Sequence, residues 1–227
     1  MGPGVPLLAE KSTDRLSFWG KGSILFGTDI RPPGRQKGAI AVKDFVREDL
    51  LLSLCGLCCG LCPMQLGGHC PGCGGGPGNQ PCAIARCSGE HGGVAYCSLC
   101  DEYPCRRYAQ PEPFDSFITH RNRRENLARV REIGTAAFRA EQEERRAALD
   151  ELLAGYNDGR RKTFFCLACN LLECGEIRGA LARLREETSP RQPLKERAAL
   201  AVGLLEGAAA RQGVTLKLRR KPREKRG

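Results

Sequence analysis

The distribution of cysteine sets the strongest limit on how this chain can fold. Eleven of its fourteen cysteines lie within residues 48–109, a stretch that is rich in glycine and poor in large apolar side chains. Such a stretch has too few apolar groups for a conventional core, so bonds from cysteine to metal would have to hold it folded. The start of the chain has no secretory leader pattern, which predicts a reducing cytosol where clustered thiols hold metal. The sequence therefore predicts a cytoplasmic, cysteine-rich, metal-binding protein.

The first cysteine group occupies residues 55–62. Cys55, Cys59 and Cys62 would place three thiolates on one tight loop, and Pro63 follows the last of them, as in bacterial ferredoxin loops. Three ligands from one loop suit an iron–sulfur cluster of the 4Fe-4S type. A structural zinc site more often takes its cysteines in pairs.

The second group has that paired form. Cys70 and Cys73 enclose Pro71-Gly72, which is the pattern of a zinc or rubredoxin-like knuckle, and Cys82 and Cys87 are candidates for the other half of the site. Zinc therefore stays open as an alternative to iron.

Two further groups share the spacing C-x2-C-x4-C, each directly behind an aromatic residue. The first contains Cys97, Cys100 and Cys105, and the second contains Cys166, Cys169 and Cys174. The group at 166–174 would need a partner ligand from the cysteines left over at 55–105 or from His69, His91 or His120. Cys58 and Cys174 are interpreted instead as small buried apolar residues.

The predicted architecture is α-rich, with a loop-rich, metal-held cysteine cluster followed by a small helical part. Four segments are expected: a Gly/Pro-rich extension at 1–47, the metal-binding region at 48–109, a helical region with a further cysteine group at 110–213, and a short strand with a basic tail at 214–227. In the first segment, apolar patches at 23–26 and 39–42 are compatible with a short hairpin. No apolar run approaches the length of about 20 residues that a membrane span needs.

Apolar periodicity places the helices. A stripe at helical spacing predicts a helix over 121–153, which Asn157-Asp158-Gly159 ends. Ile177, Leu181 and Leu184 mark a short helix. Pro193 is placed to open a last helix, which Gly213 closes. The alternation of Val214, Leu216 and Leu218 is typical of a strand.

Positive charge gathers at the end of the chain. The formal net charge is +10, and residues 217–227 hold seven Lys or Arg against Glu224. A solvated terminus is the plain interpretation. Contact with nucleic-acid phosphates through this tail is the alternative.

Catalysis is not indicated. A nucleophilic cysteine needs a nearby base, and no spacing in the sequence pairs a histidine with a thiol. No catalytic residue is therefore assigned.

Several of these blocks together resemble a known family. Cys55-Gly56-Leu57, the block 82–87, and above all Tyr96-Cys97-Ser98-Leu99-Cys100-Asp101-Glu102-Tyr103-Pro104-Cys105 are similar to the domain-of-unknown-function family 3795. Residues 157–160, 164–172 and 213–219 extend the similarity, which covers roughly 48–220. The resemblance implies a cysteine-rich, metal-binding protein with no assigned reaction. It also implies ligand roles for Cys55, Cys59, Cys62, Cys70, Cys73, Cys82, Cys87, Cys97, Cys100 and Cys105, but not for Cys58 or Cys174.

Two hypotheses of different class follow. In the first, iron–sulfur clusters transfer electrons or sense redox state together with a redox partner protein, and the three-cysteine loops favour it. In the second, zinc folds an interaction module without catalysis, and the Cys70–Cys73 knuckle favours that.

Overall fold

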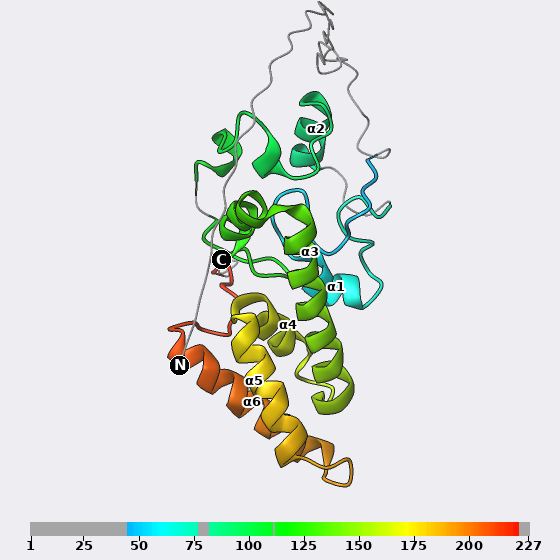
Figure 1. The fold of residues 1–227 in the computed structure, drawn as a ribbon, viewed down its shortest axis with the longest axis vertical. Coiled ribbons are helices and arrows are strands. Elements are labelled where there is room, and N and C mark those ends of the chain that lie inside the picture. Colours follow the sequence, from blue (N-terminus) through cyan, green and yellow to red (C-terminus); the bar gives the residue numbers. More distant parts are fainter. Residues whose placement is uncertain (1–44, 77–81, 111, 223–227) are drawn as a thin grey trace, which may run out of the picture. The chain divides into compact units, whose positions relative to one another are not determined.

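The structure is a computed structural model that describes residues 45–76, 82–110 and 112–222, all within one compact unit, Arg35–Gly227. In these residues all regular secondary structure is helical and no strand is present, which confirms the α-rich prediction. Irregular cysteine-bearing segments come first and long helices follow (Figure 1). The possible hairpin at 23–26 and 39–42 lies outside the described residues. No described helix has the length and apolar character that crossing a membrane would take.

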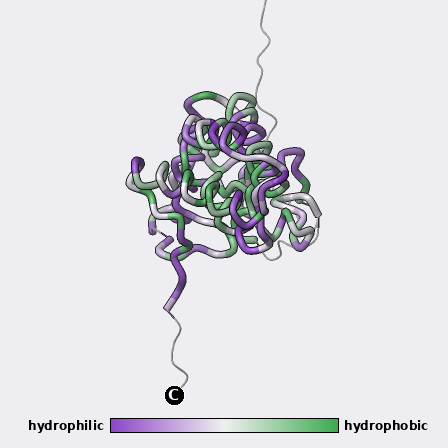
Figure 2. Tube along the Cα trace, turned by 90° about the horizontal axis from the view of Figure 1, so that it is seen from below, coloured by the Kyte–Doolittle hydropathy of each residue, from purple (hydrophilic) through white to green (hydrophobic). Residues whose placement is uncertain are grey.

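Four helices make up the second part of the described chain: α3 (Arg123–Tyr156), α4 (Lys162–Leu171), α5 (Cys174–Glu187) and α6 (Leu194–Arg211). Their apolar stripes meet in one core, in which Leu149, Phe165 and Leu184 are fully buried. Figure 2 shows the hydrophobic parts of the trace gathered toward the middle and the hydrophilic parts at the periphery. Burial of one apolar face by each helix therefore explains this half of the fold without any metal.

Helix α3 is bent, which the apolar stripe did not predict. Gly134 has φ 83° and ψ 163°, so the helix is interrupted there. Arg129 and Glu141 form an ion pair across the bend, with 2.7 Å between nitrogen and oxygen, although twelve residues of straight helix would separate them by about 18 Å. The predicted end of the helix is confirmed, because Asn157 Oδ1 accepts hydrogen bonds from the backbone of Gly159 and Arg161.

Ion pairs show the relative directions of α3, α5 and α6. Glu144 pairs with Arg178 and Glu151 with Arg185, and the equal offset means that α5 runs parallel to the second half of α3. Helix α6 runs antiparallel to α5, since the end of α6 pairs with the start of α5 through Arg211 and Glu176. Pro193 precedes α6, and Gly213 follows it with φ 65°, as predicted.

The cysteine-rich part contains only short elements: η2 (Cys59–Leu61), α1 (Pro63–Leu66), α2 (Ala83–Glu90), η3 (Cys97–Leu99) and η4 (Arg106–Tyr108). It nevertheless contributes large side chains to the common core, among them Leu52, Leu61 and Tyr108. The segment packs on α3 and α4, which supply apolar surface beyond its own. Its need for bonds from cysteine to metal stays a prediction.

The strand predicted at Val214–Leu218 is absent from the structure. Leu216 is buried, and Val214 and Leu218 pack against the core, so the alternation reflects which side chains face the helices. No strand ladder is needed because Arg121 donates hydrogen bonds to the carbonyls of Thr215 and Lys217, at 2.7 and 2.8 Å.

Asp115 fastens this C-terminal segment to the loop before α3. Its carboxylate has no exposed surface and accepts hydrogen bonds from the backbone N–H of His120 and from the backbone and side chain of Arg219. Burial opposes ionisation, but these hydrogen bonds outweigh it and lower the pKa of Asp115 below its usual value of 3.8. We expect Asp115→Asn to reduce the free energy of unfolding at pH 7 by about 2–3 kcal/mol, because the buried Arg219 contact loses its charge partner.

The pH dependence of that loss follows from the sign of the shift. A carboxyl with a lowered folded-state pKa stabilises the protein above its unfolded pKa of about 3.9, and this contribution disappears as the pH falls further. Urea denaturation should therefore show the difference between wild type and Asp115→Asn shrinking below pH 4. Asp101→Asn, at an exposed turn residue, is the control and should change stability by less than about 0.5 kcal/mol. Equal effects of the two substitutions would contradict this role.

Candidate metal centre

The loop at 55–62 is shaped by its contact with the start of α3. Gly56 has φ 94°, and a Cβ atom there would lie 2.2 Å from the carbonyl oxygen of Arg123. Arg123 Nε donates to the carbonyl of Cys55 at 2.9 Å, and Asn126 Nδ2 donates to that of Gly56 at 2.9 Å. Inside the loop, Ser53 Oγ accepts from the backbone N–H of Leu57. Hydrogen bonds from α3 and from Ser53 therefore hold the backbone of this clamped loop in place, and this fixes where its thiols lie.

Thiols from three other segments lie around this loop. Burial raises the pKa of Cys59, and the neighbouring Cys73, Cys55 and Cys62 thiols raise it further. Burial also raises the pKa of Cys73, to which Cys55 and Cys82 add. These mutual effects link seven predicted ligands into one neighbourhood, here called the thiol cluster: Cys55, Cys59, Cys62, Cys73, Cys82, Cys87 and Cys97.

Cys97 joins the thiol cluster from η3. Burial raises its pKa to about 11, a hydrogen bond from Tyr108 opposes the rise, and Cys55 and Cys87 add to it. The backbone N–H of Cys97 donates to the carbonyl of Leu54 at 2.9 Å, directly before Cys55. This hydrogen bond ties the cysteine group at 97–105 to the group at 55–62.

Helix α2 carries two of these cysteines and the donors that the sequence interpretation missed. Cys82 Sγ accepts from the backbone N–H of Ala85 at the start of the helix. At its end, one ligand atom each from Cys87, Glu90 and His91 lie within 4.8 Å of one another. Cys87 Sγ is 3.6 Å from His91 Nδ1. The statement that no spacing pairs a histidine with a thiol was wrong, since residues four apart face each other at a helix end.

Neighbouring residues contact both His91 and Cys87 of this group. His91 Nε2 lies 3.0 Å from a carboxylate oxygen of Glu102, and its Nδ1 lies 2.7 Å from the carbonyl of Cys87. The nearby Cys87 thiol raises the pKa of Arg107. Sulfur, imidazole and carboxylate together form a donor set that zinc accepts.

Within residues 45–76, 82–110 and 112–222, the Cys87–Glu90–His91 group is the one set of three His, Cys, Asp or Glu ligand atoms that all lie within 4.8 Å of one another.

Three further predicted ligands are Cys70, Cys100 and Cys105, which are partly exposed like the members of the thiol cluster. Cys70 lies on the expected glycine turn, with φ 87° at Gly72. Their ligand roles stay predictions.

The cysteines of α4 lie in the helical core. Cys166 is 3% exposed and Cys169 has no exposed surface. Burial raises the pKa of Cys166 to about 12, with a further contribution from Cys62. Their surroundings favour packing, and metal binding by this pair stays a prediction.

The two cysteines interpreted as buried apolar residues differ. Cys58 is buried and accepts a hydrogen bond from Asn126 at 3.2 Å, as that interpretation requires. Cys174 is partly exposed, so its expected burial was wrong. It begins α5 at the surface because that helix turns Ile177 and Leu181 toward the core instead.

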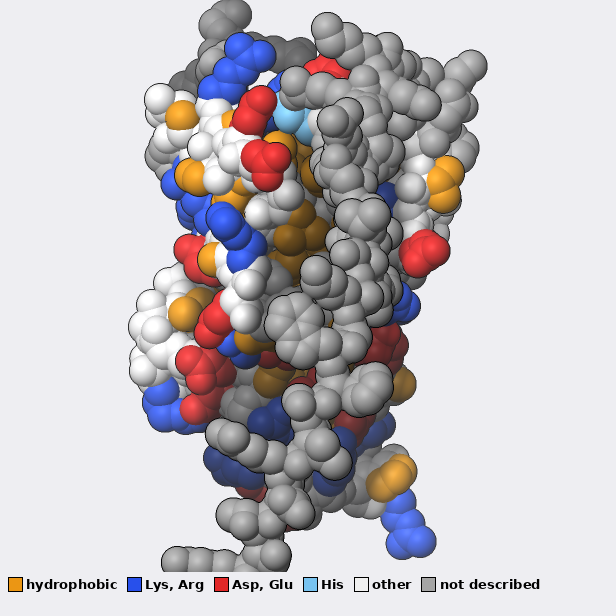
Figure 3. Space-filling view, turned by 45° about the horizontal axis from the view of Figure 1, so that its top comes forward, with side chains coloured by type: hydrophobic (Ala, Val, Ile, Leu, Met, Phe, Trp, Pro, Cys, Tyr) orange, Lys and Arg blue, Asp and Glu red, His pale blue; other side chains and the backbone are white. Residues whose placement is uncertain are grey.

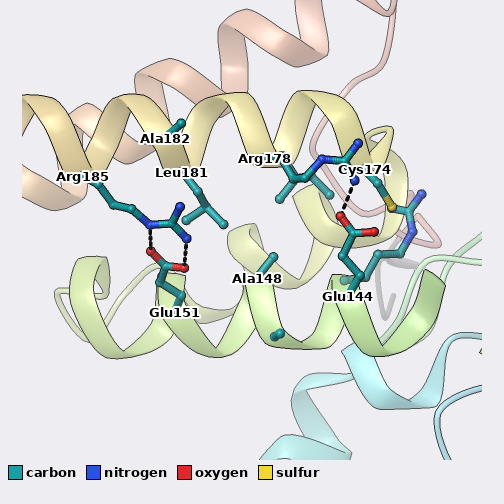
Figure 4. Close-up of a pocket in the computed structure, with 11 residues that line it drawn as sticks. Glu144, Ala148, Glu151, Cys174, Arg178, Leu181, Ala182 and Arg185 are labelled. Carbon is teal, nitrogen blue, oxygen red and sulfur yellow. Dashed lines mark hydrogen bonds and ion pairs between the residues drawn. The ribbon is translucent and has the colours of Figure 1, made fainter. Parts of the chain in front are cut away.

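Cys174 lies at one end of a groove of about 420 Å³ between α3 and α5. Figure 4 shows Ala148 and Leu181 within it and the ion pairs Glu144–Arg178 and Glu151–Arg185 reaching across. The pairs join the two helices over an apolar floor, so the groove follows from helix packing.

Comparison with known proteins adds no assignment. No family model, no curated protein and no solved structure matches the chain. The similarity to family 3795 therefore stays a prediction, and the chemistry has to be argued from the residues themselves.

Proposed function

We propose that the chain is an iron–sulfur protein that transfers electrons or senses redox state in a reducing cytosol. The thiols of Cys55, Cys59 and Cys62 would hold the iron–sulfur cluster, with Cys97 as the fourth ligand, since its backbone N–H is bonded to the carbonyl of Leu54 directly before Cys55. The observation that carries the proposal is the gathering of three other cysteine-bearing segments around one clamped loop, of which the segment of Cys97 is hydrogen-bonded to the residue before Cys55.

The arrangement of three cysteines on one loop supports a cluster over a single ion at this place. Cys55, Cys59 and Cys62 lie within one short loop, as in bacterial ferredoxin loops, whereas structural zinc sites more often take their cysteines in pairs. A bound cluster would supply one-electron redox chemistry.

Charge supports the same assignment. Cys97 and Cys73 each have an arginine close enough to lower the thiol pKa against burial, Arg123 beside Cys97 and Arg47 beside Cys73. Cations next to a thiolate cluster offset its negative charge and are one of the means by which a protein sets a reduction potential. The arginines are held in place by hydrogen bonds to the carbonyls of Cys55 and Leu52.

A structural zinc site is the second candidate, and the Cys87–Glu90–His91 group favours it. Mixed sulfur, nitrogen and oxygen ligands suit zinc better than an iron–sulfur cluster. In this alternative, the metal folds a protein-interaction module and takes no part in electron transfer.

Anaerobic purification followed by metal analysis distinguishes the two. We expect brown protein with absorbance near about 400 nm, iron and acid-labile sulfide. Zinc in addition to iron would assign the Cys87 group a separate ion. Colourless protein with stoichiometric zinc and no iron would end the redox proposal.

A further inference from the structure

A second polar site lies on the other side of the loop that carries Cys55. It is a pocket of about 160 Å³ lined by Arg107, Tyr108, Gln110, Glu112, His120, Arg121, Arg123, Arg124 and Arg219. Five of these nine residues are arginines. On the face drawn in Figure 3, by contrast, basic and acidic side chains are interspersed.

The arginines outnumber the carboxylates that could balance them. Glu112 pairs with Arg123 and with His120, and Asp115 pairs with Arg219. Arg107, Arg121 and Arg124 have no carboxylate at ion-pair distance in the part of the chain that the structure describes. Because Arg107 also lies near the Cys87 thiol and Glu90, Arg121 and Arg124 are the two cations left for a ligand of this cavity.

Two of these arginines are held in place without losing their charge. Arg121 donates to the carbonyls of Thr215 and Lys217, and Arg124 donates to those of Tyr108 and Gln110. A guanidinium has five N–H groups, so donors remain for a ligand. Burial lowers the pKa of Arg121, the charge of Asp115 opposes this shift, and the charge of Arg219 adds to it.

The start of α3 adds a second kind of donor. Asn122 makes no side-chain capping hydrogen bond to the first part of α3, which runs from Arg123 to the break at Gly134. Its first N–H groups and the helix dipole favour a negative charge there. His120, Arg121 and Arg123 come from the same turn, so the pocket and the helix start coincide.

We propose that this pocket binds the phosphate group of a small phosphorylated molecule. Planar arginine forks match phosphate oxygens in pairs. The cavity is smaller than the 300–1,000 Å³, roughly, of sites that enclose drug-sized ligands, so the phosphate enters and the rest of the molecule stays outside. Because Arg123 also holds the carbonyl of Cys55, the phosphate would lie against the back of the thiol loop. The site does not depend on which metal the thiols hold.

Calorimetric titration of the full chain with inorganic phosphate and with phenyl phosphate, at ionic strength held constant with chloride, tests this site. We expect both to bind at one site per chain. Arg121→Gln and Arg124→Gln should each weaken binding by at least about tenfold, since each removes a charge-assisted hydrogen bond. Arg191→Gln changes the net charge equally at an exposed loop residue and should leave binding unchanged.

Protein melting under the same conditions separates binding from folding. If a glutamine variant unfolds, Arg121→Lys and Arg124→Lys keep the charge but lose the fork, and they should fold and bind more weakly. Absence of binding to wild type at tens of millimolar phosphate would overturn the proposal, as would equal weakening by Arg191→Gln. Binding of a short single-stranded RNA but of neither small phosphate would overturn the assignment to a small molecule and point to a nucleic-acid backbone.

Discussion

Cys59→Ala and Cys97→Ala are each expected to lose the cluster, whereas Cys58→Ala keeps it. All three residues lie within or beside the clamped loop, but only the first two belong to the thiol cluster. Without the metal, the loop keeps its contact with α3 but loses the bonds that join it to the segment of Cys97. Iron content should fall to background in both variants, and solubility should fall with it.

Cys58 provides the matched control because it is buried in the same loop and is bonded to Asn126 rather than to the thiol cluster. Its replacement by alanine removes one small buried group and should cost about 1 kcal/mol with metal content unchanged. The measurement is iron per chain in anaerobically purified variants. If the three variants lost the same amount of iron, the assignment of ligands within this loop would be refuted.

Gly56→Ala is expected to be the most damaging substitution that touches no ligand. The new Cβ would meet the carbonyl oxygen of Arg123 at 2.2 Å and the side chain of Leu127 at 2.9 Å. Neither can move easily, since both belong to α3. Strain at φ 94° costs about 1–2 kcal/mol and the steric overlap about 1–3 kcal/mol, so the free energy of unfolding should fall by about 2–5 kcal/mol.

Gly68→Ala separates those two contributions. Gly68 also has positive φ, 71°, but nothing lies within 4 Å of an added Cβ. It should cost only the backbone strain, about 1–2 kcal/mol. Chemical denaturation of both variants, with metal content measured in parallel, gives the comparison. Equal losses would mean that the loop does not pack closely on α3.

Helix positions could be predicted because they follow from local chemistry. The apolar spacing of Leu149 and Leu152, the break at Asn157 and the start after Pro193 each depend on residues close in sequence. The bend at Gly134 could not be predicted, because a single glycine is compatible with a straight helix and the bend is settled by packing on both sides.

The candidate site was only partly predictable for the same reason. Spacing identified the cysteine-bearing loops, but which thiols face one another depends on how α3 holds the loop of Cys55. His91 carries a usable signal, since it follows Cys87 by four residues, and that signal was missed. At Leu216 a local signal was instead over-interpreted. The alternation of apolar residues at 214–218 predicted a strand, but it marks the side chains that contact the helices. Apart from His91, these arrangements are decided by long-range contacts that no local pattern encodes.

Native mass spectrometry of the oxygen-protected full chain tests the central claim most directly, because it weighs the folded polypeptide with whatever it holds. We predict a mass above that of the bare chain by one iron–sulfur cluster, lost together with the compact charge-state distribution in Cys59→Ala. A compact wild-type protein at the mass of the bare polypeptide, with the thiols of Cys55, Cys59 and Cys62 open to alkylation, would contradict a metal-bound thiol cluster.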